Sequence, residues 1–254
     1  MRLLADYHTH TLYSHGKGKV EDNARVAQER GLKEVAITDH GPAHPLVGVR
    51  SLESLKKIKE DIVECRDKFP QLKILLGLEA NVISTSGDLD ISPSYIKDLD
   101  LLLVGLHTGI IPKNLSSAFN LVVKNWGAKI NSYLYREARQ VNTSSLVRAV
   151  YKHPVHTVVH PGLELNIDTR ELARACAFRG TALEINCSHG EKTLQYLEAA
   201  AGTRVKFVIN SDAHNPQEVG ALEPGIKLAL KLGIEEGRVL NSSFYMDKKD
   251  EHFR

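Results

Sequence analysis

The sequence LLADYHTHT occupies residues 3–11, near the start of the chain. It is a short apolar run that ends in two histidines, His8 and His10. Residues two apart on a β-strand lie on the same face, so the two imidazoles can bind one metal ion. Apolar runs that end on a potential ligand recur along the chain, and this recurrence indicates the fold.

Seven short apolar runs alternate with helical segments, the pattern typical of parallel β-α-β units. The expected strands are 3–8, 34–40, 73–79, 101–107, 157–160, 181–186 and 206–212. The expected helices are 20–30, 52–68, 144–152, 169–179, 193–201 and 216–232. A length of 254 residues is close to that at which one α/β barrel closes. We therefore predict one α/β domain over residues 1–254.

Six of the expected strands end on a potential metal ligand. These residues are His8 with His10, His40, Glu79, His107, His160, and Asp212 with His214. A single histidine at a strand end is usually a surface or hydrogen-bonded residue, but parallel barrels build their active sites from the carboxyl ends of strands. Imidazole and carboxylate without thiolate suit zinc, manganese or iron. The set therefore predicts a metal site at that end of the barrel.

Taken in order, these motifs resemble the PHP (polymerase and histidinol phosphatase) superfamily, and within it the bacterial YcdX-type phosphatases. The motifs are DYHTHT at 6–11 followed by His15, TDHG at 38–41, GLEAN at 77–81, GLH at 105–107, VHPG at 159–162 and SDAH at 211–214. The likeness extends from residue 6 to about residue 241. The amidohydrolase superfamily shares the HxH start and a late aspartate, but it leaves His15, His40 and His107 unexplained.

The resemblance implies a distorted seven-stranded (β/α)7 barrel, similar to a TIM barrel, with a trinuclear site for about three divalent ions. Zinc is expected first, with manganese or iron as alternatives. By the resemblance, His8, His10, Glu79 and Asp212 hold one ion, Glu79 with His107 and His160 a second, and His15, His40 and His214 the third.

Such a cluster can lower the pKa of a bridging water and hold phosphoryl oxygens, so it favours phosphate ester hydrolysis. We expect a phosphatase for a small phosphomonoester, with a metal-bridging hydroxide held by Glu79, His8, His10 and Asp212. A phosphodiesterase or exonuclease acting on nucleic acid and a noncatalytic metal-binding scaffold are the alternatives. Lys plus Arg (33) nearly balance Asp plus Glu (31), which disfavours a nucleic acid partner.

Residues 119–139 depart from the YcdX pattern, because they add a segment after the fourth expected strand. The segment contains the one tryptophan, Trp126, together with Arg136 and Arg139. A loop at that end of a strand overhangs the active site. We expect either a lid with substrate contacts from Arg136 and Arg139, or an oligomer contact; the physiological substrate stays open.

Other polar residues are expected to support the site. His189 and Asn186, at the end of the sixth expected strand, are further candidates for substrate contact. Asp39 is expected to orient the loop after the second strand, and Asp6 to accept a hydrogen bond from the ring of His8.

The cysteines and the apolar runs indicate the cellular compartment of the protein. Cys65, Cys176 and Cys187 form no CxxC pair, which fits a reducing compartment. The first apolar run is too short for a signal peptide, and no stretch of 18 apolar residues follows. We expect a cytoplasmic protein with no membrane partner.

Overall fold

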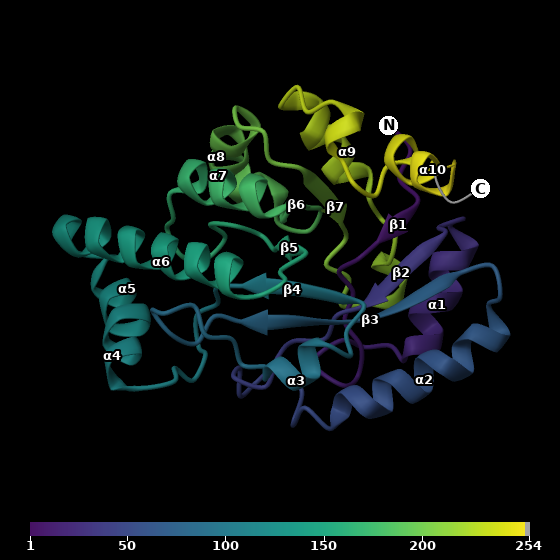
Figure 1. Cartoon of the computed structure of the whole chain (residues 1–254), viewed down its shortest axis with the longest axis horizontal. Helices are drawn as coiled ribbons and strands as arrows, with labels where there is room; N and C mark the ends of the chain where they lie inside the picture. Colours follow the sequence, from purple (N-terminus) through teal and green to yellow (C-terminus); the bar gives the residue numbers. More distant parts are fainter. Residues whose placement is uncertain (252–254) are drawn as a thin grey trace.

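The computed structural model describes residues 1–251, and its centre is one sheet of seven parallel strands (Figure 1). The strands are β1 (Ala5–Asp6), β2 (Glu34–Ile37), β3 (Lys73–Asn81), β4 (Leu101–Gly105), β5 (Thr157–Val158), β6 (Ala182–Asn186) and β7 (Phe207–Asn210). Each strand pairs with the next one along the chain. The predicted (β/α)7 barrel is therefore confirmed.

Helices cover the outside of this sheet, with α1 to α3 on one side and α6 to α9 on the other (Figure 1). The α-helices are α1 (Val20–Glu29), α2 (Ser54–Lys68), α3 (Pro93–Ile96), α4 (Leu115–Ala118), α5 (Lys124–Gly127), α6 (Ser132–Lys152), α7 (Thr169–Arg179), α8 (Gly190–Ala201), α9 (Glu223–Lys231) and α10 (Ser243–Glu251). A π-helical segment, η1 (Phe119–Val123), joins α4 to α5, and two short 3₁₀ turns are η2 (Pro216–Glu218) and η3 (Glu236–Arg238).

The core lies between the strands and the helices. In α2 the buried residues Leu55, Ile58 and Ile62 are three or four positions apart, which gives the helix one apolar face. They belong to the same apolar cluster as Ile37 of β2 and Leu78 of β3. Burial of one such side chain stabilises the fold by about 1.5–3 kcal/mol. This packing leaves the carboxyl ends of the strands free to carry polar residues.

The barrel closes between β1 and β7 through a side chain as well as the backbone. Beyond the strand ends, Thr9 forms a parallel bridge with Ala213. Lower down, the buried amide of Asn241 donates to the carbonyls of Ala5 (2.8 Å) and Ile209 (2.7 Å). It also accepts from the N–H of Ile209 (3.1 Å). Asn241 thus supplies hydrogen bonds that a direct β1–β7 ladder would otherwise make.

The 119–139 segment is helical and forms one end of the molecule with α4 (Figure 1). The helix expected from residue 144 begins at Ser132 instead, because Asn131 caps it by accepting from the backbone N–H groups of Tyr133 and Leu134. The helix expected at 216–232 is divided into η2 and α9, and Gly220 lies between them with a left-handed φ of 73°. Within residues 1–251, no helix combines the length and apolar character that a membrane crossing requires.

Candidate metal centre

The predicted ligands converge on Glu79, which lies fully buried on β3. Its Oε2 is 3.2 Å from Nε2 of His8 and 2.8 Å from Nδ1 of His40. Its Oε1 is 3.0 Å from Nε2 of both His107 and His160. One carboxylate therefore contacts four imidazoles that come from four different strand ends.

Asp212, just after β7, supplies the second carboxylate. Its Oδ1 lies 3.2 Å from Nε2 of His10 and 3.5 Å from Nε2 of His8. Asp212 (φ 57°) and His160 (φ 27°) are the non-glycine residues with positive φ in the described part of the chain. Such conformations cost energy and cluster at functional sites, so their presence at two predicted ligands is consistent with a functional constraint here.

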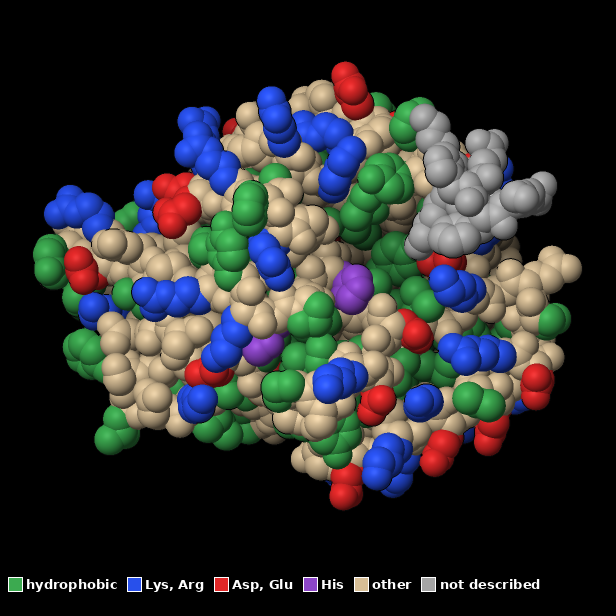
Figure 2. Space-filling view, viewed as in Figure 1, with side chains coloured by type: hydrophobic (Ala, Val, Ile, Leu, Met, Phe, Trp, Pro, Cys, Tyr) green, Lys and Arg blue, Asp and Glu red, His purple; other side chains and the backbone are tan. Residues whose placement is uncertain are grey.

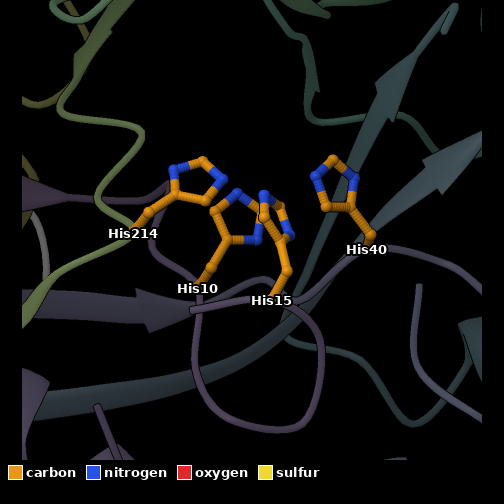
Figure 3. A group of neighbouring side chains, drawn as sticks. All are labelled: His10, His15, His40 and His214. Carbon is orange, nitrogen blue, oxygen red and sulfur yellow. The ribbon is translucent and has the colours of Figure 1, made fainter. Parts of the chain in front are cut away.

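A group of histidines completes the centre: His10, His15, His40 and His214 (Figure 3). One ring nitrogen from each lies within 4.8 Å of one from every other member. The ligand atoms of His8, His10 and Asp212 also lie within 4.8 Å of one another, and so do those of His40, Glu79 and His107. All the residues predicted as metal ligands are thus brought together, with His160 joined through His107 at 3.3 Å between their Nε2 atoms.

Unpaired polar atoms test whether these residues fit a metal. Several buried side-chain atoms have no partner with hydrogen-bond geometry, although Oε2 of Glu79 lies within 3.2 Å of two of the others: they include Nε2 of His8, Nδ1 of His10, Nδ1 of His15, Nδ1 of His40 and Oε2 of Glu79. Buried polar atoms are normally hydrogen-bonded, and leaving one unpaired costs about 1–3 kcal/mol. Lone pairs of imidazole and carboxylate gathered in one place fit divalent ions such as zinc.

The electrostatics of the site favour bound cations. Burial alone would raise the pKa of Glu79, but His40, His8 and His107 hold it well below its usual range. Burial also opposes ionisation of Asp212, yet His8 and His10 hold its pKa low as well. Both carboxylates are therefore ionised. Burial, with His214 and His40, lowers the pKa of His15 to about 4, which leaves its imidazole neutral and able to coordinate.

A second layer of side chains orients the imidazoles. Glu184 on β6 is buried, and its Oε1 lies 2.7 Å from Nδ1 of His8. Its Oε2 accepts from the backbone N–H of His160 at 2.8 Å. Asn81 places Oδ1 2.7 Å from Nδ1 of His107. These contacts direct Nε2 of His8 and His107 towards Glu79.

The expected role of Asp6 is wrong, because the carboxylate that contacts Nδ1 of His8 belongs to Glu184. The carboxylate of Asp6 accepts instead from Ser211, at both its N–H (3.1 Å) and its hydroxyl, and from the N–H of Gly220 (2.8 Å). It therefore ties the loops after β7 together. Asp39 holds a different loop from the one expected: it accepts from the N–H (2.7 Å) and the hydroxyl (2.6 Å) of Thr11 and from Ser14, which fixes the loop after β1 that carries His15.

The four predicted substrate contacts occupy different environments. His189 lies beside the centre, with Nε2 3.8 Å from Asp212 and a side chain that is 33% exposed. Asn186 is buried and donates to Glu184 and Asp212 at 3.0 Å each. Arg139 is paired with Asp168 at 2.7 Å, and Arg136 is exposed on α6. Substrate contact by these residues stays a prediction.

Comparison with known proteins gives one family match. The sequence model described as "PHP domain" matches residues 6–211. A probable phosphatase of Thermoanaerobacter sp. (strain X514) is 28% identical over 252 residues, which cover 95% of this chain and 91% of that protein. A probable phosphatase of Caldanaerobacter subterraneus subsp. tengcongensis is 29% identical over 265 residues, covering 100% and 92%. The closer likeness to YcdX-type phosphatases stays a prediction.

Solved structures share the fold. The crystal structure of histidinol phosphate phosphatase from Lactococcus lactis subsp. lactis, complexed with zinc, L-histidinol and phosphate, superposes with a TM-score of 0.62. The match covers 92% of this chain and 95% of that one, at 17% sequence identity. At this identity the likeness establishes a common fold.

Proposed function

The chain belongs to the PHP domain family and is a hydrolase of phosphoric ester bonds, and on that basis we propose that it removes phosphate from a small phosphomonoester at a site for about three divalent ions. The observation that carries the proposal is the convergence of four imidazoles on the buried carboxylate of Glu79. The names of the similar relatives, which are probable phosphatases, support the reaction class.

The proposed ligands divide into three sets. His8, His10 and Asp212 would hold the first ion together with Glu79, which would bridge to a second ion held by His107 and His160. His15, His40 and His214 would hold the third. The grouping of His8, His10 and Asp212, and of His15, His40 and His214 with His10, supports this division, while the grouping of His40 with Glu79 and His107 places His40 next to the second set as well.

When bound, divalent ions would lower the pKa of a water that they share and would balance the charge of the phosphoryl oxygens. The chain itself fixes the geometry. Glu184 and Asn81 hold His8 and His107 with Nε2 towards the centre, while Asn186 holds the second oxygen of Asp212. His189, partly exposed beside Asp212, would contact the phosphate. His8, His10, His40, Glu79, His160 and Asp212 are buried, whereas His15 and His214 are partly exposed, so solvent and substrate would reach the site from the side of these two histidines.

Replacement of Glu79 by glutamine tests the proposal, because it removes one negative charge while keeping the size of the side chain. Activity towards p-nitrophenyl phosphate should fall by about a hundredfold or more, as expected when a central electrostatic group is lost. Glu198→Gln, on the exposed surface of α8, is the matched control and should retain wild-type activity. Circular dichroism should show that both variants stay folded.

A substrate panel separates the alternatives. Wild-type protein should hydrolyse p-nitrophenyl phosphate and small sugar or amino-alcohol phosphates faster than bis-p-nitrophenyl phosphate or a short single-stranded DNA. Preference for the diesters would favour the exonuclease alternative. Full metal content without turnover of any substrate would favour a noncatalytic scaffold, and equal activity in wild type and Glu79→Gln at unchanged metal content would refute the proposed centre.

A further inference from the structure

A cavity of about 580 Å³ lies between the 119–139 segment and the loops that follow β4 and β5. Its volume falls in the range of about 300–1,000 Å³ typical of small-molecule sites. Val122, Trp126 and Tyr135 of the segment line this cavity together with Leu165, which follows β5. None of these residues belongs to the proposed metal centre.

The cavity borders the metal centre through two of its lining residues, Thr108 and Glu164. Thr108 directly follows the proposed ligand His107. The carboxylate of Glu164 accepts from both the N–H (2.7 Å) and the hydroxyl (2.6 Å) of Thr108. This wall is therefore continuous with the loop that positions a metal ligand.

The outer wall is held in place by contacts to α6. Asn125 and Asn142 exchange two amide hydrogen bonds of 2.8 Å, and Lys124 pairs with Glu137 at 3.3 Å. The hydroxyl of Tyr135 lies 3.3 Å from Oδ1 of Asn166, on the opposite wall. The cavity is thus preformed, as substrate pockets usually are.

The walls are mainly apolar and carry aromatic rings. Trp126 is 77% exposed and Val122 is 41% exposed, although both line the cavity. Figure 2 shows separate hydrophobic side chains among charged and other residues at this end of the molecule, where Figure 1 places α4, α5 and the start of α6. Exposed tryptophan and tyrosine rings stack well on planar ligands.

We propose that this cavity binds the organic group of the substrate, and that this group is aromatic. The inference rests on the proposed phosphatase function and names its substrate class: an aryl or heteroaryl phosphomonoester whose phosphate lies at the metal centre and whose ring lies against Trp126 and Tyr135. The 119–139 segment then acts as a fixed wall that selects the substrate.

Two neighbouring valines provide a matched pair of variants. Val122 lines the cavity, whereas Val123, which is 51% exposed, is absent from its lining. Val122→Asn should lower kcat/KM for phenyl phosphate by about tenfold relative to kcat/KM for glycerol 3-phosphate, since a change in an apolar pocket alters discrimination by about 10–200-fold. Val123→Asn should leave this ratio at the wild-type value.

Ligand binding can be measured without turnover by tryptophan fluorescence, because Trp126 is the one tryptophan of the chain. In zinc-loaded wild-type protein, phenylphosphonate should shift the Trp126 emission to shorter wavelength, and methylphosphonate, which has the same head group, should not. The Kd for phenylphosphonate should rise about tenfold in Val122→Asn and stay unchanged in Val123→Asn.

The possible results distinguish a failure of the proposed phosphatase function from a failure of the proposed substrate pocket. If no phosphomonoester is hydrolysed, the proposed function fails, and this inference falls with it. If the enzyme is active but both valine variants behave alike, or both phosphonates give the same emission, the cavity is not the substrate pocket. If the two variants instead share a changed oligomeric state in light scattering, the exposed face of the segment is an interface and the inference is also overturned.

Discussion

Glu184 and His8 form a fully buried hydrogen bond, with 2.7 Å between Oε1 of the carboxylate and Nδ1 of the imidazole. An ionised carboxylate can only accept, so Nδ1 of His8 carries the proton. Burial alone would lower the pKa of His8, but the carboxylates of Glu184, Asp212 and Glu79 raise it. A bound cation must therefore replace the proton on Nε2, and the lone pair then faces Glu79 and Asp212. Glu184 thereby fixes the one tautomer in which His8 can coordinate a metal from inside the barrel.

Glu184→Gln should weaken metal binding while the barrel stays folded. The amide keeps the size of the side chain but loses its charge, and its NH₂ group cannot accept from His160 as Oε2 does. Loss of such an outer partner lowers metal affinity by about 10–100-fold. Competition with a chromogenic chelator measures this change. Glu198→Gln is the control, and equal zinc affinity in both variants would show that Glu184 does not orient the ligand.

Asn241→Leu should destabilise the barrel without touching the predicted ligands. The substitution leaves the carbonyls of Ala5 and Ile209 and the N–H of Ile209 without their partner. At about 1 kcal/mol for each lost bond, the free energy of unfolding should fall by roughly 3 kcal/mol. Urea denaturation in the presence of a chelator measures it. Asn120→Leu, at the surface, should cost far less, and a similar loss in both variants would argue against the closing role.

Asp88 should make stability depend on pH in the acid range. Hydrogen bonds from Lys152 and Ser84, with Lys113 nearby, hold the pKa of Asp88 well below its usual range. The folded pKa is therefore lower than the unfolded value of about 3.9. This contribution is complete above about pH 5 and is lost as the pH falls below about 4 towards the folded pKa.

The difference in unfolding temperature between wild type and Asp88→Asn should accordingly be largest near neutral pH and shrink below about pH 4. The ion pairs are partly exposed, so a loss of about 1 kcal/mol is expected at neutral pH. Scanning calorimetry with a chelator present removes any effect of metal release. Asp98→Asn, at an exposed residue, is the control, and a difference that grows as the pH falls would contradict the assignment.

The sequence predicts the strands and the convergence of the ligands well, for a physical reason. Each short apolar run could be recognised locally, and the carboxyl ends of parallel strands share one end of a barrel. His8, Glu79 and Asp212 therefore meet although they are far apart in the chain. The strand-end ligands needed only the positions of the strand ends, which local patterns supply, whereas His15, in the loop after β1, was expected from the family resemblance.

The roles of Glu184 and Asn241 could not be predicted in the same way. Glu184 lies within the sixth expected strand, but its partner His8 is 176 residues away, and a strand pattern does not say which partner a side chain meets. Asn241 lies outside any regular element and closes the barrel only through its amide. The early start of α6 depended on one cap, Asn131, inside a segment without a clear apolar face.

The metal content of the protein tests the central claim most directly. Protein equilibrated with zinc and then separated from unbound ions should contain about two to three zinc ions per chain, because the predicted imidazole ligands gather around Glu79 and Asp212 and several of them carry unpaired atoms. Elemental analysis gives this number. Fewer than about one ion per chain, with no phosphatase activity restored by zinc or manganese, would contradict the account.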